Sequence, residues 1–296
     1  MSRIPYSEIS SIGFYVLGDR ENEIDSHVKV TNPDGMRGSI PYPNGICDAH
    51  MGSTSHEWAC ETCKYDKKLC PGHSGTIFLH YPVLSPMFIK EAVKWLKIIC
   101  FACGKLIIPF KRLQVRKDKI LSEFVKLAVR ADNKNVKCIE CSAIHPHISR
   151  DKNDDISIYI EIYNRPESDA KSKKIFLFTH QIRNIFNKIS DETVLQMCKP
   201  LISHPKKFPL YWIRVPPNTI RPDIKKIGGG RSNSNDLTIL VQLIVKLNSE
   251  IPTTIPTDID DSLRFKIYNL SLAVFDLIKG SSSTSKRTIV NNSKKP

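Results

Sequence analysis

Residues 60–73 read CETCKYDKKLCPGH and hold three cysteines and one histidine in a short span. Cys60 and Cys63 form a Cys-x2-Cys turn, and Cys70 and His73 form a second pair with the same spacing. A short turn of this kind brings two ligand atoms to one ion, and the second pair closes a tetrahedron. Four protein ligands leave no open position for water or substrate, so this stretch predicts a structural zinc site.

Two other histidines precede this cluster and could replace His73 as the fourth ligand. His50 and His56 lie close enough in the sequence, but neither has the paired spacing. A set of unrelated thiols is the remaining alternative.

Two further Cys-x2-Cys pairs follow, in IICFACGKLI (98–107) and VKCIECSAIH (136–145). We expect their four cysteines to share one zinc ion and so to close a sizeable insertion, because a single metal explains both pairs: Cys100, Cys103, Cys138 and Cys141.

A redox-active pair is an alternative for either turn, and two histidines close to the last pair could also act as ligands. These are His145 and His147. Cys47 and Cys198 belong to neither set, and we interpret them as inert thiols.

The composition limits where this chain works and what it binds. Its 296 residues are 41% hydrophobic, which is ordinary for a globular protein. The N-terminus has no secretory signal pattern, and apolar runs such as 238–245 are shorter than the roughly 20 residues of a membrane-spanning helix. We therefore expect a protein that is neither secreted nor membrane-bound, in a reducing compartment where cysteines bind metal.

The net charge of +14 indicates a polyanionic partner, of which nucleic acid is the commonest. The alternatives are a charge that serves solubility alone and an acidic protein partner.

Hydrophobic patterns predict a mixture of helices and strands, and the fold class is therefore α+β. Residues 76–84 and 156–163 are typical of strands. We expect one helix to begin with Ser85 as its cap and another to be capped by Asp236. A final helix is expected over about 260–278, ending at Gly280.

Several of these motifs together resemble a known family. GICDAHMGS (45–53), the cluster at 60–73 and IICFACGKLI resemble the N-terminus of the largest subunit of multisubunit DNA-directed RNA polymerases. The resemblance continues through VPPNTIRPDI (215–224) and NDLTILVQLIVKLN (235–248), so it covers essentially the whole chain. The compact spacing of the last cysteine pair is most similar to the versions of large nucleocytoplasmic DNA viruses.

The resemblance implies a polymerase clamp with two structural zinc sites, divided into three segments. Residues 1–84 would form the first part of the clamp core with the first zinc site, 85–204 the clamp head with the second, and 205–296 the returning part of the core. In this last part, 223–235 matches the lid and 280–296 the rudder. Basic side chains there are candidate phosphate contacts, namely Arg221, Lys225, Lys226, Arg231, Lys286 and Arg287.

The family's catalytic Asn-Ala-Asp-Phe-Asp-Gly-Asp signature is absent from the chain. Asp258, Asp260 and Asp261 have the wrong spacing for it and open a helix instead. We therefore expect Mg²⁺ only in the complete polymerase, of which this chain is a first piece that is inactive alone.

The partners implied by the resemblance are the DNA template, the RNA–DNA hybrid, and the second-largest and other polymerase subunits. The implied location is a nucleus or a cytoplasmic viral factory, with packaging in the virion a further expectation. The alternative function is a free-standing, zinc-containing transcription regulator that binds nucleic acid.

Overall fold

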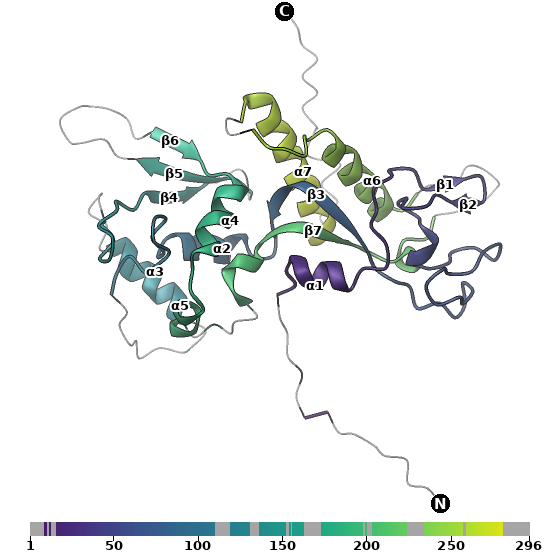
Figure 1. Cartoon of the computed structure of the whole chain (residues 1–296), viewed down its shortest axis with the longest axis horizontal. Coiled ribbons are helices and arrows are strands. Elements are labelled where there is room, and N and C mark those ends of the chain that lie inside the picture. Colours follow the sequence, from purple (N-terminus) through teal and green to yellow (C-terminus); the bar gives the residue numbers. More distant parts are fainter. Residues whose placement is uncertain are drawn as a thin grey trace, which may run out of the picture.

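The computed structural model describes most of the chain. The described residues are 9–10, 12, 16–109, 119–130, 136–151, 154, 156–162, 173–197, 199, 203–223, 234–256 and 259–280. They form an elongated molecule of mixed helices and strands, as the sequence predicted (Figure 1).

The centre of the molecule is a long antiparallel pair of strands, β3 (Gly75–Leu84) and β7 (Pro209–Val215). Gly75 pairs with Val215 and Leu84 with Pro209, so the chain between these strands leaves and returns at one end of the ribbon. That register makes the intervening segment, about 85–208, a separate lobe at one end of the long axis (Figure 1).

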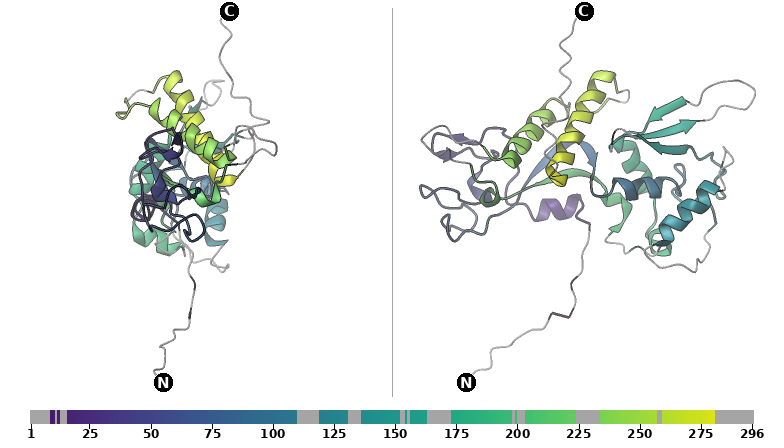
Figure 2. Two further views of the ribbon diagram at one scale, coloured as in Figure 1. Left: turned by 90° about the vertical axis from the view of Figure 1, so that its right-hand side faces the viewer. Right: turned by 180° about the vertical axis from the view of Figure 1, so that it is seen from behind.

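Helices cover both faces of this central ribbon. The helices α6 (Asp236–Ser249) and α7 (Asp261–Lys279) pack against each other and against β3. The short helix α1 (Asp19–Ile24) contacts β7 from the opposite side, as the view from behind shows (Figure 2).

The lobe between the ribbon strands carries its own sheet and helices. Its sheet has the order β4–β5–β6, all antiparallel, and α2 contacts β4. The bounds of these elements are β4 His147–Arg150, β5 Ile158–Ile162, β6 Lys173–Phe176, α2 Ile89–Leu96, α3 Ile120–Arg130, α4 Thr179–Asn187 and α5 Asp191–Gln196. A small hairpin, β1 (Met36–Arg37) with β2 (Ile40–Pro41), lies at the other end of the molecule (Figure 1).

The buried apolar residues fall into two clusters. One contains mainly lobe residues, from Leu84 to Phe208, with Val16 added from the N-terminal side. The other joins residues 28–83 to residues 210–277 across the central ribbon. Tyr81 links the two, because its hydroxyl lies 2.9 Å from Nδ1 of His180 on α4.

Two expected helix caps are wrong, one by three positions and the other by one. Ser85 begins a turn, in which its carbonyl accepts from Phe88 N, and α2 starts only at Ile89. Asn235, not Asp236, caps α6, with its side chain accepting from Leu237 N at 2.9 Å. The final helix runs from Asp261 to Lys279 and ends at Gly280, close to the prediction.

Candidate metal centres

The structure brings the first predicted ligand set together. Ligand atoms of Cys60, Cys63, Cys70 and His73 all lie within 4.8 Å of one another. The four come from two turns, each enclosing two residues, which fold back on one point. This donor set of three sulfurs and one imidazole nitrogen is one that zinc binds in structural sites.

His73 has the chemistry that a metal ligand needs. Its Nε2 atom is buried and has no hydrogen-bond partner among the described residues. Burial, together with the neighbouring His27 ring, lowers the pKa of His73 below its ordinary value of 6.5, so the imidazole is neutral near pH 7. A neutral imidazole within 4.8 Å of three thiol sulfurs fits a metal ion.

The two alternative histidines do not join this group. His50 Nδ1 instead lies 2.8 Å from Oδ1 of Asp48, which also caps the short turn at residues 49–51. His56 is exposed on the surface.

The second set also assembles, although its two halves are far apart in the sequence. Sγ of Cys100 lies 3.5 Å from Sγ of Cys141, and Sγ of Cys103 lies 3.7 Å from Sγ of Cys138. All four sulfurs are within 4.8 Å of one another. Neither His145 nor His147 belongs to this group.

The electrostatics of the four thiols favour a bound cation. Burial raises the pKa of Cys100 to about 12. Burial also raises the pKa of Cys138, but backbone N–H groups of Cys141 and Glu140 and the neighbouring thiols outweigh it and lower the pKa to about 7. Thiols this close cannot all ionise on their own, whereas a divalent ion at their centre would make each of them a thiolate.

The three Cys-x2-Cys turns share one backbone geometry. In each, the first cysteine's carbonyl accepts from an N–H four residues later, at 2.8–2.9 Å. That residue has a positive φ in all three turns: 63° at Lys64, 74° at Gly104 and 58° at Ser142. The turn therefore directs both sulfurs to the same side.

Gly104 is the one glycine among these three positions, and packing explains it. A Cβ placed on Gly104 would lie 2.3 Å from the carbonyl oxygen of Lys188. Lys188 crosses this turn, and its Nζ donates to the carbonyls of Phe101 and Ala102 at 2.8 and 3.2 Å. The second metal group is thus held directly against the end of α4.

Gly72 has a comparable role at the first metal group. Its φ is +85°, and a Cβ there would meet Oγ1 of Thr219 at 2.2 Å. Thr219 belongs to the VPPNTIRPDI segment after β7, so this segment packs closely on the first group.

The prediction that Arg221 contacts phosphate is wrong in this structure, because the side chain is only 4% exposed. Its guanidinium donates to the carbonyls of Pro216 and Ile46, both at 2.9 Å. It also donates to Oδ1 of Asn218 at 2.8 Å and Oγ1 of Thr238 at 3.3 Å. The Arg221 guanidinium therefore joins buried parts of the chain through hydrogen bonds and is not a cation at the surface. Sequence reasoning found the motif but did not identify the role of Asn218.

The other predicted phosphate contacts are five basic residues. Lys225, Lys226, Arg231, Lys286 and Arg287 lie outside the described residues.

The sequence also singled out an acidic cluster and two cysteines that belong to neither metal group. Asp258 and Cys198 also lie outside the described residues. Asp260 is the N-cap of α7, accepting from Leu263 N at 2.8 Å, and Asp261 is the first residue of that helix. Burial raises the pKa of Cys47, so this thiol stays protonated near neutral pH.

Comparison with known proteins decides the family. The family described as RNA polymerase Rpb1, domain 1, matches residues 6–296. The chain belongs to this Rpb1 domain 1 family. The resemblance seen in the sequence is therefore confirmed, and the Rpb1 match does not favour the alternative of a free-standing regulator.

Rpb1 relatives come from viruses and from cellular organisms. The DNA-directed RNA polymerase RPB1 homolog of African swine fever virus isolate Warthog/Namibia/Wart80/1980 is 32% identical over 96% of this chain and 20% of the relative. That of isolate Pig/Kenya/KEN-50/1950 is 33% identical over the same shares. DNA-directed RNA polymerase II subunit RPB1 of Euplotoides octocarinatus is 27% identical over 84% of this chain and 55% of the relative.

This Rpb1-family chain spans about a fifth of the length of its viral relatives. Among the helices that the structure describes, none combines the length and apolar character needed to cross a membrane.

Proposed function

We propose that this chain is the N-terminal part of the largest subunit of a DNA-dependent RNA polymerase and forms its clamp. The clamp would close over the DNA template and the RNA–DNA hybrid during transcription. The complete enzyme would be a nucleotidyltransferase whose catalytic aspartates and Mg²⁺ lie outside this chain. The chain alone should not polymerise nucleotides.

Two zinc ions would hold the clamp's shape. Cys60, Cys63, Cys70 and His73 would bind one, and the four cysteines of the second group would bind the other. A set of four ligands that is rich in sulfur and leaves no coordination position open suits structural zinc. The unpartnered Nε2 of His73 and the contacts between paired sulfurs support this assignment.

The two hydrophobic clusters support the division into clamp core and clamp head. We assign residues 1–84 and 205–296, which include the central ribbon, α6 and α7, to the core, and residues 85–204 of the lobe to the head. The first metal group directly precedes β3 in the core, and the second belongs to the lobe. Each unit would thus be stabilised by its own metal ion as well as by its own apolar cluster.

The proposed partners are the template, the hybrid, and the second-largest and other polymerase subunits. The net charge of +14 supports contact with nucleic acid, and five cations remain candidates for it: Lys225, Lys226, Arg231, Lys286 and Arg287. The proposed location is a nucleus or a cytoplasmic viral factory, and the proposal includes packaging in the virion.

The observation that carries this proposal is the family match over residues 6–296. The test is to isolate the chain, through an affinity tag, from cells that make it. We expect a complex that incorporates nucleotides only with a DNA template and Mg²⁺, and photoreactive template DNA should cross-link to this chain. Recovery of the chain by itself, bound to DNA but without nucleotide incorporation, would support a free-standing regulator instead.

A further inference from the structure

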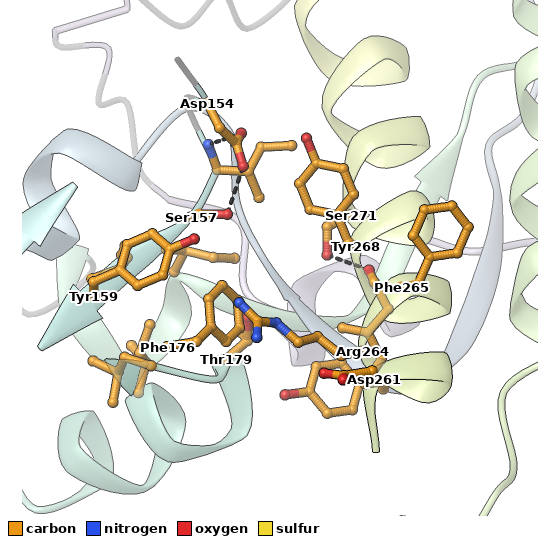
Figure 3. A pocket seen from close by; sticks show the side chains of 17 residues that line it. Asp154, Ser157, Tyr159, Phe176, Thr179, Asp261, Arg264, Phe265, Tyr268 and Ser271 are labelled. Atoms are coloured by element: carbon orange, nitrogen blue, oxygen red, sulfur yellow. Dashed lines mark hydrogen bonds between the residues drawn. The ribbon is translucent and has the colours of Figure 1, made fainter. Parts of the chain in front are cut away.

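A cavity of about 340 Å³ lies between the lobe sheet and α7, apart from both metal groups. Strands β5 and β6 and the start of α4 form one side of it, and one face of α7 forms the other (Figure 3). It therefore lies between the two hydrophobic clusters. Cavities between structural units are common places for small-molecule sites.

We call this space between the lobe sheet and α7 the seam cavity, and its lining is largely apolar. Side chains buried in the two clusters form part of its wall, among them Leu84, Ile158, Ile182 and Ile267. Aromatic rings stand on both sides, with Tyr159 and Phe176 on the lobe side and Phe265 and Tyr268 on α7 (Figure 3). Such walls suit a flat, apolar body.

Arg264 supplies a positive charge to this apolar space. Its guanidinium lies 4.7 Å from the centre of the Phe176 ring, so it reaches from α7 across to the lobe (Figure 3). Within the described part of the chain it has no carboxylate partner, whereas Arg183 and Arg214 pair with Asp19 and Asp25. Its donors are thus available for an anionic group.

Two hydroxyl groups in the lining of the cavity are also available. Those of Tyr159 and Thr179 line the cavity and make no hydrogen bond within the described residues. Two carboxylates line it as well and restrict where an anion can lie. Asp154 already accepts from Ile156 N and Ser157 Oγ, at 2.9 and 2.5 Å, and Asp261 is exposed.

We propose that the seam cavity binds a small, planar, apolar molecule that carries a single carboxylate. The ring system would lie between the aromatic walls, and the carboxylate would bind Arg264 with help from the Tyr159 hydroxyl. Because the ligand would contact both units, it would hold the lobe against α7. This inference does not depend on the polymerase assignment.

The test uses 2-naphthoate as the probe and the whole 296-residue chain as the receptor. We expect saturable binding by calorimetry, and a thermal unfolding midpoint that rises with naphthoate concentration. The uncharged 2-naphthamide should bind about tenfold more weakly, since its amide oxygen can accept from Arg264 but carries no negative charge. No binding of naphthoate, or equal binding of the two compounds, would overturn the proposal.

Variants locate the binding in the cavity. Arg264→Gln should weaken naphthoate binding about tenfold, whereas Lys266→Gln, which removes a charge from the same helix outside the cavity lining, should leave it unchanged. Tyr159→Phe removes the hydroxyl but keeps the ring, so it tests the same site even if Arg264→Gln fails to fold. It should weaken naphthoate binding about 2- to 10-fold. Affinity that stays at the original value in Tyr159→Phe and in folded Arg264→Gln would place the ligand elsewhere.

Discussion

Arg221 donates a hydrogen bond from Nη2 to Oδ1 of Asn218, three residues earlier, at 2.8 Å. Asn218 in turn donates from Nδ2 to the carbonyls of Cys47, Asp48 and Gly52, at 3.1, 2.8 and 3.0 Å. These carbonyls belong to the segment just before the first metal group. The pair therefore ties the chain after β7 to the base of that group.

Replacing Arg221 with lysine should destabilise the fold by about 2–4 kcal/mol, because a lysine cannot reach all the buried acceptors that the guanidinium satisfies. Urea denaturation of the two proteins measures the difference. Arg214→Lys is the matched control, since Arg214 forms a partly exposed ion pair with Asp25 and should change stability by less than about 1 kcal/mol. Equal losses would contradict the special role of Arg221.

The two ligand groups predict two zinc ions per chain when the protein is purified without chelator. Cys70→Ser and Cys138→Ser should each reduce the content to one, and Cys47→Ser should leave it at two. Removal of either ion should unfold its neighbourhood, because apparent binding energies of about 10–16 kcal/mol are folding energy in such sites. Metal analysis that finds one ion or none in the unaltered protein would refute this.

Gly104 and Ser142 occupy the same position in two Cys-x2-Cys turns, but we expect substitutions at these two residues to have very different effects. Gly104→Ala adds a Cβ 2.3 Å from a carbonyl oxygen at a positive φ, so it should displace α4 from the second metal group and cause loss of that zinc. Ser142→Gly relieves a positive φ of 58° in the partner turn and should change stability by no more than about 1 kcal/mol. Metal content and thermal unfolding of both variants check the contrast. Retention of two zinc ions by a stable Gly104→Ala protein would argue against it.

The metal groups could be predicted from the sequence because each Cys-x2-Cys turn is a local structure. Spacing alone sets the direction of the two sulfurs, and apolar flanks place the turn at the edge of a core. The pairing of Cys100/Cys103 with Cys138/Cys141 needed only the inference that two incomplete sites complete each other. Strand β3 and the final helix could also be predicted, because their apolar periodicity is strong.

Features that depend on distant packing could not be predicted in this way. The burial of Arg221 depends on Ile46, which is 175 positions away in the sequence, and on Thr238 of α6. Helix α1 has the sequence DRENEI, with little apolar periodicity, and it is held by polar contacts to residues far along the chain. Asp19 Oδ1, for example, accepts from Tyr211 N and Trp212 N at 2.7 and 3.1 Å.

The attachment of α1 should depend on pH through Glu21. A hydrogen bond from Lys207 lowers the pKa of Glu21 below its ordinary value of 4.5. The folded protein thus favours the carboxylate, and this stabilisation is fully present above pH 4.5 and is lost as the pH falls through the lower folded value.

Glu21→Gln should accordingly be less stable than the unaltered protein by about 0.5–1 kcal/mol at pH 7, because the pair is partly exposed to solvent. The difference between the two proteins should shrink below pH 4.5. Denaturant titrations at several pH values measure it. The metal ligands titrate in both proteins, so they cancel in the comparison. A difference that stays constant down to pH 3 would show that Glu21 acts through its shape and not its charge.

If the clamp proposal is right, this chain should bind DNA or RNA weakly and without sequence preference. Its affinity should fall steeply as the salt concentration rises. Each phosphate neutralised on duplex DNA contributes about 0.9 to the slope of log affinity against log salt. If Lys286 and Arg287 each contact one phosphate, replacing both with glutamine should reduce the slope by about 1.8. Arg221→Lys should leave the slope unchanged, because Arg221 is buried and already bonded within the protein. Selection of one sequence from a random pool, or binding that does not respond to salt, would indicate a regulator that reads bases rather than a clamp that holds the backbone.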